Sequence, residues 1–157
     1  MKPVLRTILG GLGSVVLAVL LMQLIPYGRN HTNPPVLAEP PWDSPGTRAL
    51  AQRACFDCHS NETLWPWYSE IAPESWLFYR DVAIGREHFN FSEWNAHPSL
   101  PGGQGEGEEH QHGPEVVIDS IELGEMPPAL YLLMHPSARL TQDETNLLVE
   151  GLIASLK

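Results

Sequence analysis

The sequence predicts an all-α protein, and three observations favour this class. Several stretches beyond residue 42 repeat apolar residues at the three-to-four-residue spacing of one helix face. Most of these stretches are bounded by residues that are suited to begin or end a helix. No stretch alternates apolar and polar residues between turn signals, as the strands of a sheet would. We therefore expect about four helices, joined by long proline-rich loops.

The first two of these helices are predicted from their starting residues. Ser44 can cap a helix in which Pro45 takes the first position, and this helix continues to Ala54. A second helix is predicted to begin near Pro73 and to run through Ile84. Its helical spacing is carried by Trp76, Leu77, Arg80, Ala83 and Ile84.

The last two helices carry clear end signals. Gly113-Pro114 opens a third, short helix, for which Gly124 is the expected C-terminal stop. Thr141 and Glu144 form a T-x-x-E capping box at the start of the final helix. The apolar faces are Val117 and Ile121 in the third helix, and Leu147, Leu148, Leu152, Ile153 and Leu156 in the last.

The N-terminal segment predicts a single membrane anchor over residues 1–27. The run from Val4 to Ile25 is almost entirely apolar and is close to the ~20 residues that a bilayer core requires. A cleaved signal peptide is the alternative, but the best small-residue site, residues 36–38, lies well past the apolar core. Lys2 and Arg6 before the segment predict a cytoplasmic N-terminus, with the rest of the chain facing the periplasm or extracytoplasmic space. The expected location is therefore the cytoplasmic membrane, in contact with lipid, with one pass.

The remainder divides into a proline-rich tether, residues 28–41, and one domain, residues 42–157. All nineteen acidic residues lie beyond Tyr27, whereas two of the nine basic residues precede it. This charge argues against a nucleic-acid partner. It either serves solubility alone or also forms a docking face for a basic redox protein.

The pentapeptide Cys55-Phe56-Asp57-Cys58-His59 is the main chemical signal. C-x-x-C-H is the pattern of covalent c-type haem attachment, in which each cysteine bonds one vinyl group and the histidine ligates iron. The chain has only these two cysteines, which argues against a disulfide framework. A zinc site would need further ligands at suitable spacing, and a thioredoxin-like dithiol would need a neighbouring βαβ pattern. The sequence therefore predicts one covalent haem c in a cytochrome c-like helical domain.

The second axial ligand of the iron is predicted to be Met126. It follows an expected helix end and precedes Pro127-Pro128, which would stiffen its loop. A weak thioether ligand needs such prior positioning, although a lone methionine can also serve core packing. Met134 and His135 are near rivals, and His88 is a more distant one.

Two further segments have open interpretations. The aromatic residues between Trp65 and Tyr79 can wall a haem crevice, donate hydrogen bonds to its propionates, or simply pack a core. Residues 97–112 are rich in Gly, Pro, Glu and His, and are predicted to form a solvated loop. Metal binding by the histidines of this loop is the alternative.

Longer motifs resemble the bacterial haem-binding domain family of small c-type cytochromes. They are Cys55–Thr63, Trp65–Ser69, Ile71–Pro73, Ser75–Trp76, His88–Trp94, Gly124–Pro127 and His135–Pro136. The resemblance covers roughly Trp42 to Lys157, and it implies thioether bonds at Cys55 and Cys58, a proximal His59 and a distal Met126. An N-terminal membrane segment is also typical of such proteins. The Gly/Glu/His-rich loop departs from the family pattern.

Three functions compete on this basis, of which the third is a haem-carrying interaction module of a larger complex, where the tether and the acidic face matter more than the redox step. The first is an electron carrier, a membrane-anchored monohaem cytochrome that transfers single electrons outside the cytoplasmic membrane, without catalytic residues. The second is a haem enzyme or a gas or redox sensor with an open distal site, in which His88 or His135 acts on a bound ligand. Whether the protein is an enzyme therefore depends on the sixth ligand, and the carrier is favoured.

Overall fold

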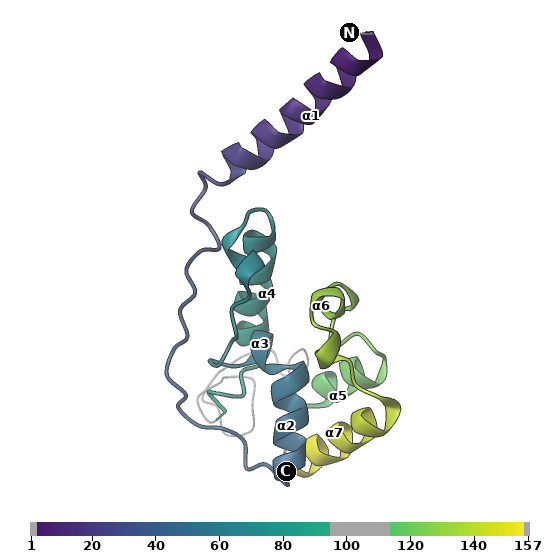
Figure 1. The fold of residues 1–157 in the computed structure, drawn as a ribbon. Coiled ribbons are helices and arrows are strands. Elements are labelled where there is room, and N and C mark those ends of the chain that lie inside the picture. The colour runs from purple at the N-terminus through teal and green to yellow at the C-terminus, as the bar shows by residue number, and fades with distance from the viewer. Residues whose placement is uncertain (1–2, 95–113, 156–157) are drawn as a thin grey trace. The chain divides into compact units, whose positions relative to one another are not determined.

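The computed structural model describes residues 3–94 and 114–155, and within these residues the secondary structure is helical (Figure 1). The predicted all-α class is thereby confirmed. The α-helices are α1 (Pro3–Met22), α2 (Pro45–Ala54), α3 (Phe56–His59), α4 (Glu74–His88), α5 (Pro114–Glu122), α6 (Ala129–Met134) and α7 (Gln142–Ser155). Two 3₁₀ helices, η1 (Trp67–Glu70) and η2 (Pro136–Ala138), complete the list. The predicted solvated loop, residues 97–112, lies outside the described residues.

The capping signals in the sequence place the starts of two helices. The Ser44 hydroxyl accepts the Thr47 N–H at 3.1 Å, which satisfies one of the open donors of α2. At α7, the Thr141 N–H donates to Glu144 Oε2 at 2.8 Å and the Glu144 N–H donates to Thr141 Oγ1 at 3.3 Å. This reciprocal pair is the predicted capping box.

The backbone contacts divide the chain into two units. The N-terminal unit consists of Met1–Thr32 and Trp65–Asp81, and the motif unit consists of Asn33–Leu64 and Val82–Lys157. Helix α4 contributes its first half to one unit and its second half to the other. The division proposed from the sequence, at residues 27 and 41, stays a prediction.

The N-terminal unit begins with α1, which is long and apolar enough to cross a membrane by its length and composition. The helix ends at Met22, three residues before the predicted Ile25. The Gln23 side-chain amide then pairs with the backbone of Ala72, because its Nε2 donates to the Ala72 carbonyl at 2.9 Å and its Oε1 accepts the Ala72 N–H at 3.1 Å. The Tyr27 and Tyr79 rings meet edge to face at 5.4 Å. These contacts join the end of α1 to residues 72–79.

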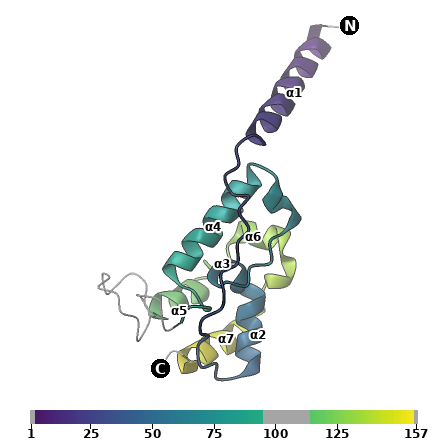
Figure 2. The same cartoon turned by 90° about the vertical axis from the view of Figure 1, so that its left-hand side faces the viewer.

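The motif unit is built around α7, against which α2 and α5 both pack (Figure 2). The α2–α7 contact is close because Gly151 lies against Thr47, and a Cβ at this glycine would overlap the Thr47 side chain. The core comprises Leu50, Ala51, Phe56, Phe89, Phe91, Trp94, Ile121, Leu148, Val149 and Leu152. Phe56 lies inside the C-x-x-C-H sequence, so the motif itself is part of this core.

Two features follow α5. Gly124 has φ +70°, a left-handed conformation that favours glycine, and its N–H donates to the Ile121 carbonyl at 3.1 Å. The predicted helix stop is therefore confirmed. The sequence interpretation placed a loop stiffened by Pro127-Pro128 before the final helix, whereas the structure contains α6 there, immediately after Pro128. With six residues, α6 is too short to show a helical period in the sequence.

Candidate haem site

The C-x-x-C-H sequence forms a single tight turn between α2 and α4. The Cys55 carbonyl accepts N–H bonds from Cys58 at 3.2 Å and from His59 at 2.9 Å. Cys58 and His59 thus follow Cys55 by three and four positions, the spacing at which side chains of one helical turn are neighbours of the first residue. Both sulfurs are thiols. This arrangement matches what attachment to two vinyl groups and ligation from below a porphyrin require.

His59 is held at both its ring and its backbone. Its Nδ1 lies 3.1 Å from the Phe89 carbonyl, and the Phe91 N–H donates to the His59 carbonyl at 2.8 Å. Because a carbonyl only accepts, Nδ1 carries the hydrogen in this contact and Nε2 keeps its lone pair. Burial lowers the pKa of His59, which favours the neutral ring. A neutral imidazole whose outer nitrogen is fixed by a carbonyl is typical of metal-ligating histidines.

Cys55 lies against the apolar core, where it packs beside the buried residues of the motif unit. Burial raises the pKa of its thiol to about 12. At neutral pH the thiol is therefore protonated and weakly reactive toward solvent reagents. The residues present thus fit a haem, with two free thiols for thioether bonds and one imidazole nitrogen for iron.

The segment after the motif is held by a buried polar network. The Asn90 amide donates to Asn61 Oδ1 at 3.0 Å, the Asn61 N–H donates to Ser92 Oγ at 2.9 Å, and the Ser92 N–H donates to Asn90 Oδ1 at 2.9 Å. All three residues are buried. Asn61 Nδ2 also donates to the Pro35 carbonyl at 3.0 Å. Because Ser92 lies one residue from Phe91, which binds His59, the network fixes the proximal side of the site.

Helix α4 supports the motif directly. The Arg86 guanidinium donates to the Ser60 carbonyl at 2.8 Å and to Thr63 Oγ1 at 2.8 Å. The preceding residue, Gly85, packs against Cys58, and a Cβ at Gly85 would clash with the Cys58 carbonyl. Helix and motif are therefore in backbone contact, which only glycine permits here.

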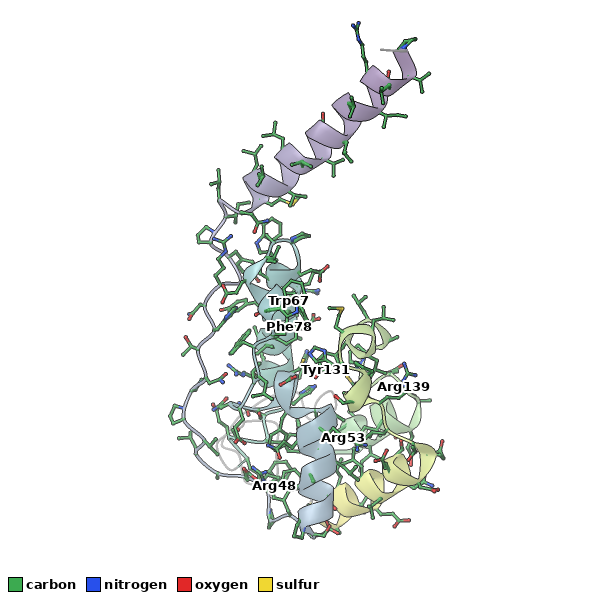
Figure 3. All side chains as sticks on the ribbon, viewed as in Figure 1. Arg48, Arg53, Trp67, Phe78, Tyr131 and Arg139 are labelled. Atoms are coloured by element: carbon green, nitrogen blue, oxygen red, sulfur yellow. The ribbon has the colours of Figure 1, made fainter. Side chains whose placement is uncertain are left out.

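Asp57 connects the motif to α6. Its Oδ1 accepts the Leu64 N–H at 2.9 Å, and its Oδ2 accepts the Tyr131 hydroxyl at 2.7 Å. Tyr131 in turn stacks on His135, with ring centroids 4.0 Å apart and 14° between the planes. Figure 3 labels Tyr131, which is a residue of α6. One carboxylate thus joins the motif to the segment that contains the candidate distal ligands.

The candidate distal ligands occupy different settings. Met126 follows α5, its N–H donates to the Ser120 carbonyl at 3.1 Å, and it is 41% exposed. Met134 ends α6 and is 55% exposed, whereas His135 is partly buried against Tyr131. His88 is exposed at the end of α4, and its charge contributes to the lowered pKa of His59. The choice of Met126 among these four residues stays a prediction.

Several residues of the site were not identified from the sequence as site residues. Asp57, Gly85, Phe89 and Tyr131 act through contacts with residues far along the chain. Asp57 stands at a variable position of C-x-x-C-H, and Phe89 belongs to one of the longer motifs. These positions are the signals by which Asp57 and Phe89 could have been found, although neither signal shows which residue the side chain or backbone contacts.

Comparison with known proteins agrees with this geometry. Residues 17–154 match the family described as the haem-binding domain, which covers most of the chain. No curated protein and no solved structure matches the chain. The site fits a haem, and the match extends over all of the described motif unit except its last residue. The chain therefore belongs to the haem-binding domain family and is a haem-binding protein.

Proposed function

We propose that the protein is a membrane-anchored c-type cytochrome with one covalent haem that transfers single electrons outside the cytoplasmic membrane. The observation that carries the proposal is the single turn that gathers Cys55, Cys58 and His59. Its outer histidine nitrogen is bound to the Phe89 carbonyl. Cys55 and Cys58 would form the thioether bonds and His59 Nε2 would ligate iron.

Met126 is the proposed sixth ligand. The backbone bond to Ser120 and the hydrogen bond from Tyr131 to Asp57 restrict the segment on either side of it. Two axial protein ligands would leave no iron position for a substrate, so a bound haem would supply a one-electron couple and nothing else. The residues of the chain then hold the ligands in place and exclude water from the iron.

The spectrum of the purified full-length protein tests this assignment. With Met126 bound, the ferric form is expected to be low-spin with a sulfur-to-iron charge-transfer band, and carbon monoxide should bind poorly to the ferrous form. Met126→Ala should abolish the band, whereas Met134→Ala, a matched control at an exposed methionine, should keep it. A high-spin wild-type haem that binds carbon monoxide or peroxide readily would instead support a haem enzyme or sensor.

Membrane anchoring is proposed from α1, together with the basic residues that precede and follow it. Lys2 precedes it, Arg6 lies in its first turn, and Arg29 follows it. The expected topology has the N-terminus in the cytoplasm and the motif unit outside. A reporter fused after Lys157 that works only in the cytoplasm should stay inactive, and an active reporter would contradict the orientation.

A basic redox protein is the proposed partner, because the chain is strongly acidic with a formal net charge of −10. Attraction between opposite charges raises the association rate and is screened by salt. Electron transfer to a basic small cytochrome should therefore slow as ionic strength rises. An unchanged or increased rate would leave the acidic charge with a role in solubility alone.

A further inference from the structure

The N-terminal unit carries exposed apolar and aromatic residues that the haem site does not use. We propose that these residues form an interfacial patch that lies in the headgroup region of the bilayer. The patch consists of Leu24, Ile25, Tyr27, Trp67 and Ile71, whose exposed fractions are 77%, 47%, 51%, 72% and 44%. The inference rests on the proposed function in one respect, since it requires α1 to span the membrane.

The contacts of Gln23 place the two parts of the patch together. Gln23 follows the last residue of α1, and its side chain pairs with both backbone groups of Ala72. Leu24 and Ile71 are the immediate chain neighbours of these paired residues. Trp67 begins η1, whose next residues lead directly to Ile71. The apolar surface therefore continues from the end of α1 onto η1.

Further contacts hold η1 close to the chain that leaves α1. His31 Nδ1 lies 3.1 Å from Glu70 Oε1, and His31 Nε2 lies 3.2 Å from the Ser69 carbonyl. The His31 ring also stacks on Trp65, with centroids 4.4 Å apart. The carboxylate within η1 is thus already paired, which lowers the cost of placing this segment near lipid.

The chemistry of the patch fits a bilayer surface. Trp and Tyr collect at membrane interfaces, where the ring is buried and its polar edge stays hydrated. Arg29 donates to the Gln23 carbonyl at 2.7 Å, so a cation also lies at the exit of α1, at the depth of the lipid phosphates. Because the exposed Trp67 belongs to η1, which Gln23 and His31 tie to the chain that leaves α1, the bilayer is the occupant that we infer.

Photolabelling tests the inference in the full chain. The haem-loaded protein is placed in phosphatidylcholine nanodiscs that contain a phosphatidylcholine with a diazirine near its glycerol backbone, and labelled peptides are identified by mass spectrometry. We expect label at residues 24–27 and 67–71. The α6 residues Leu130 and Leu133, which are 68% and 73% exposed, serve as an internal control and should carry several-fold less.

Two variants sharpen the experiment. Gln23→Ala should lower the label at residues 67–71 while α1 stays labelled, because the bonds to Ala72 are lost. Trp67→Ser with Ile71→Ser should remove that label, whereas the matched change of Leu130 and Leu133 to serine should not. Label at 67–71 that does not exceed the α6 label, with α1 labelled, would overturn the patch. An unlabelled α1 would instead contradict membrane anchoring itself.

Discussion

The Tyr131 hydroxyl donates a 2.7 Å hydrogen bond to the Asp57 carboxylate, across 74 positions of the chain. This bond joins α6 to the C-x-x-C-H turn. The other carboxylate oxygen of Asp57 accepts a hydrogen bond from the Leu64 N–H, and the Tyr131 ring stacks on the His135 ring. The relationship links the proximal motif to the segment between Met126 and His135, and it therefore bears on the sixth ligand.

Tyr131→Phe should loosen this segment without removing the haem. Hydrogen bonds to charged groups contribute about 1.5–3 kcal/mol, and a loss of this size permits binding of added imidazole at the iron that is tighter by about 10- to 100-fold. The sulfur-to-iron charge-transfer band should weaken in the same variant. Optical titration of the ferric protein with imidazole measures both effects.

Tyr79→Phe provides the matched control, since it removes a hydroxyl from the N-terminal unit. It should leave imidazole affinity unchanged. If Tyr131→Phe also has wild-type affinity and an unchanged spectrum, the bond to Asp57 does not position the distal ligand.

Gly85→Ala should destabilise the protein by about 1–3 kcal/mol, because the added Cβ forces α4 away from the Cys58 carbonyl. Denaturant unfolding followed by circular dichroism gives the free energy of unfolding. Gly46→Ala is the control, because a Cβ there meets only Ser44 Oγ at 3.6 Å. It should be neutral or stabilising by up to about 1 kcal/mol. Equal stabilities for the two variants would contradict the close packing of α4 on the motif.

Asn61→Ala should cost about 1–3 kcal/mol, because it leaves the buried Asn90 amide without its Oδ1 acceptor and the Pro35 carbonyl without its side-chain donor. The exposed Asn146 accepts a bond from Gln142 at 3.0 Å, and Asn146→Ala should change stability little. Thermal unfolding of the haem-loaded variants compares them. A similar melting temperature for both would show that the network contributes little.

Stability should fall in acid partly through Glu39. Two bonds from Arg48, at 2.7 and 2.6 Å, are the main cause that lowers the pKa of Glu39. A lowered folded-state pKa stabilises the protein above the unfolded value, about 4.3, and this contribution disappears as the pH falls through the folded-state pKa. The expected loss is about 1 kcal/mol, since both side chains are partly exposed.

Unfolding measurements at neutral pH and below pH ~4 test the role of Glu39. Glu39→Gln should be less stable than wild type at neutral pH, and the difference should vanish in acid. The exposed Glu150→Gln is the control and should follow the wild-type profile. If Glu39→Gln stays less stable than wild type in acid, its lower stability comes from altered packing and not from the lost charge.

Local signals in the sequence were sufficient for the helices whose ends are chemically marked. Ser44 with Thr47, Thr141 with Glu144, and Gly124 each act within a few residues, so their geometry can be anticipated from spacing. Helix α6 was missed because it lacks two full turns and follows two prolines. The spacing of C-x-x-C-H likewise predicts that Cys55, Cys58 and His59 lie within one turn.

The supporting contacts of the site could not be predicted in this way. His59 meets Phe89 across 30 positions and Asn61 meets Asn90 across 29, and no local rule pairs them. Such pairs are fixed by the tertiary packing of the motif unit, which one sequence does not reveal. The longer motifs marked these residues as a group but gave no partner for any of them.

Covalent attachment of haem is the central claim, and haem staining of the denatured chain tests it most directly. The full-length protein is expressed in a host that matures c-type cytochromes, washed in acid-acetone and examined by denaturing gel and mass spectrometry. The wild-type chain should stain and carry the mass of one haem, whereas a chain with Cys55→Ser and Cys58→Ser should not. A colourless wild-type chain with the mass of the polypeptide alone would contradict the account.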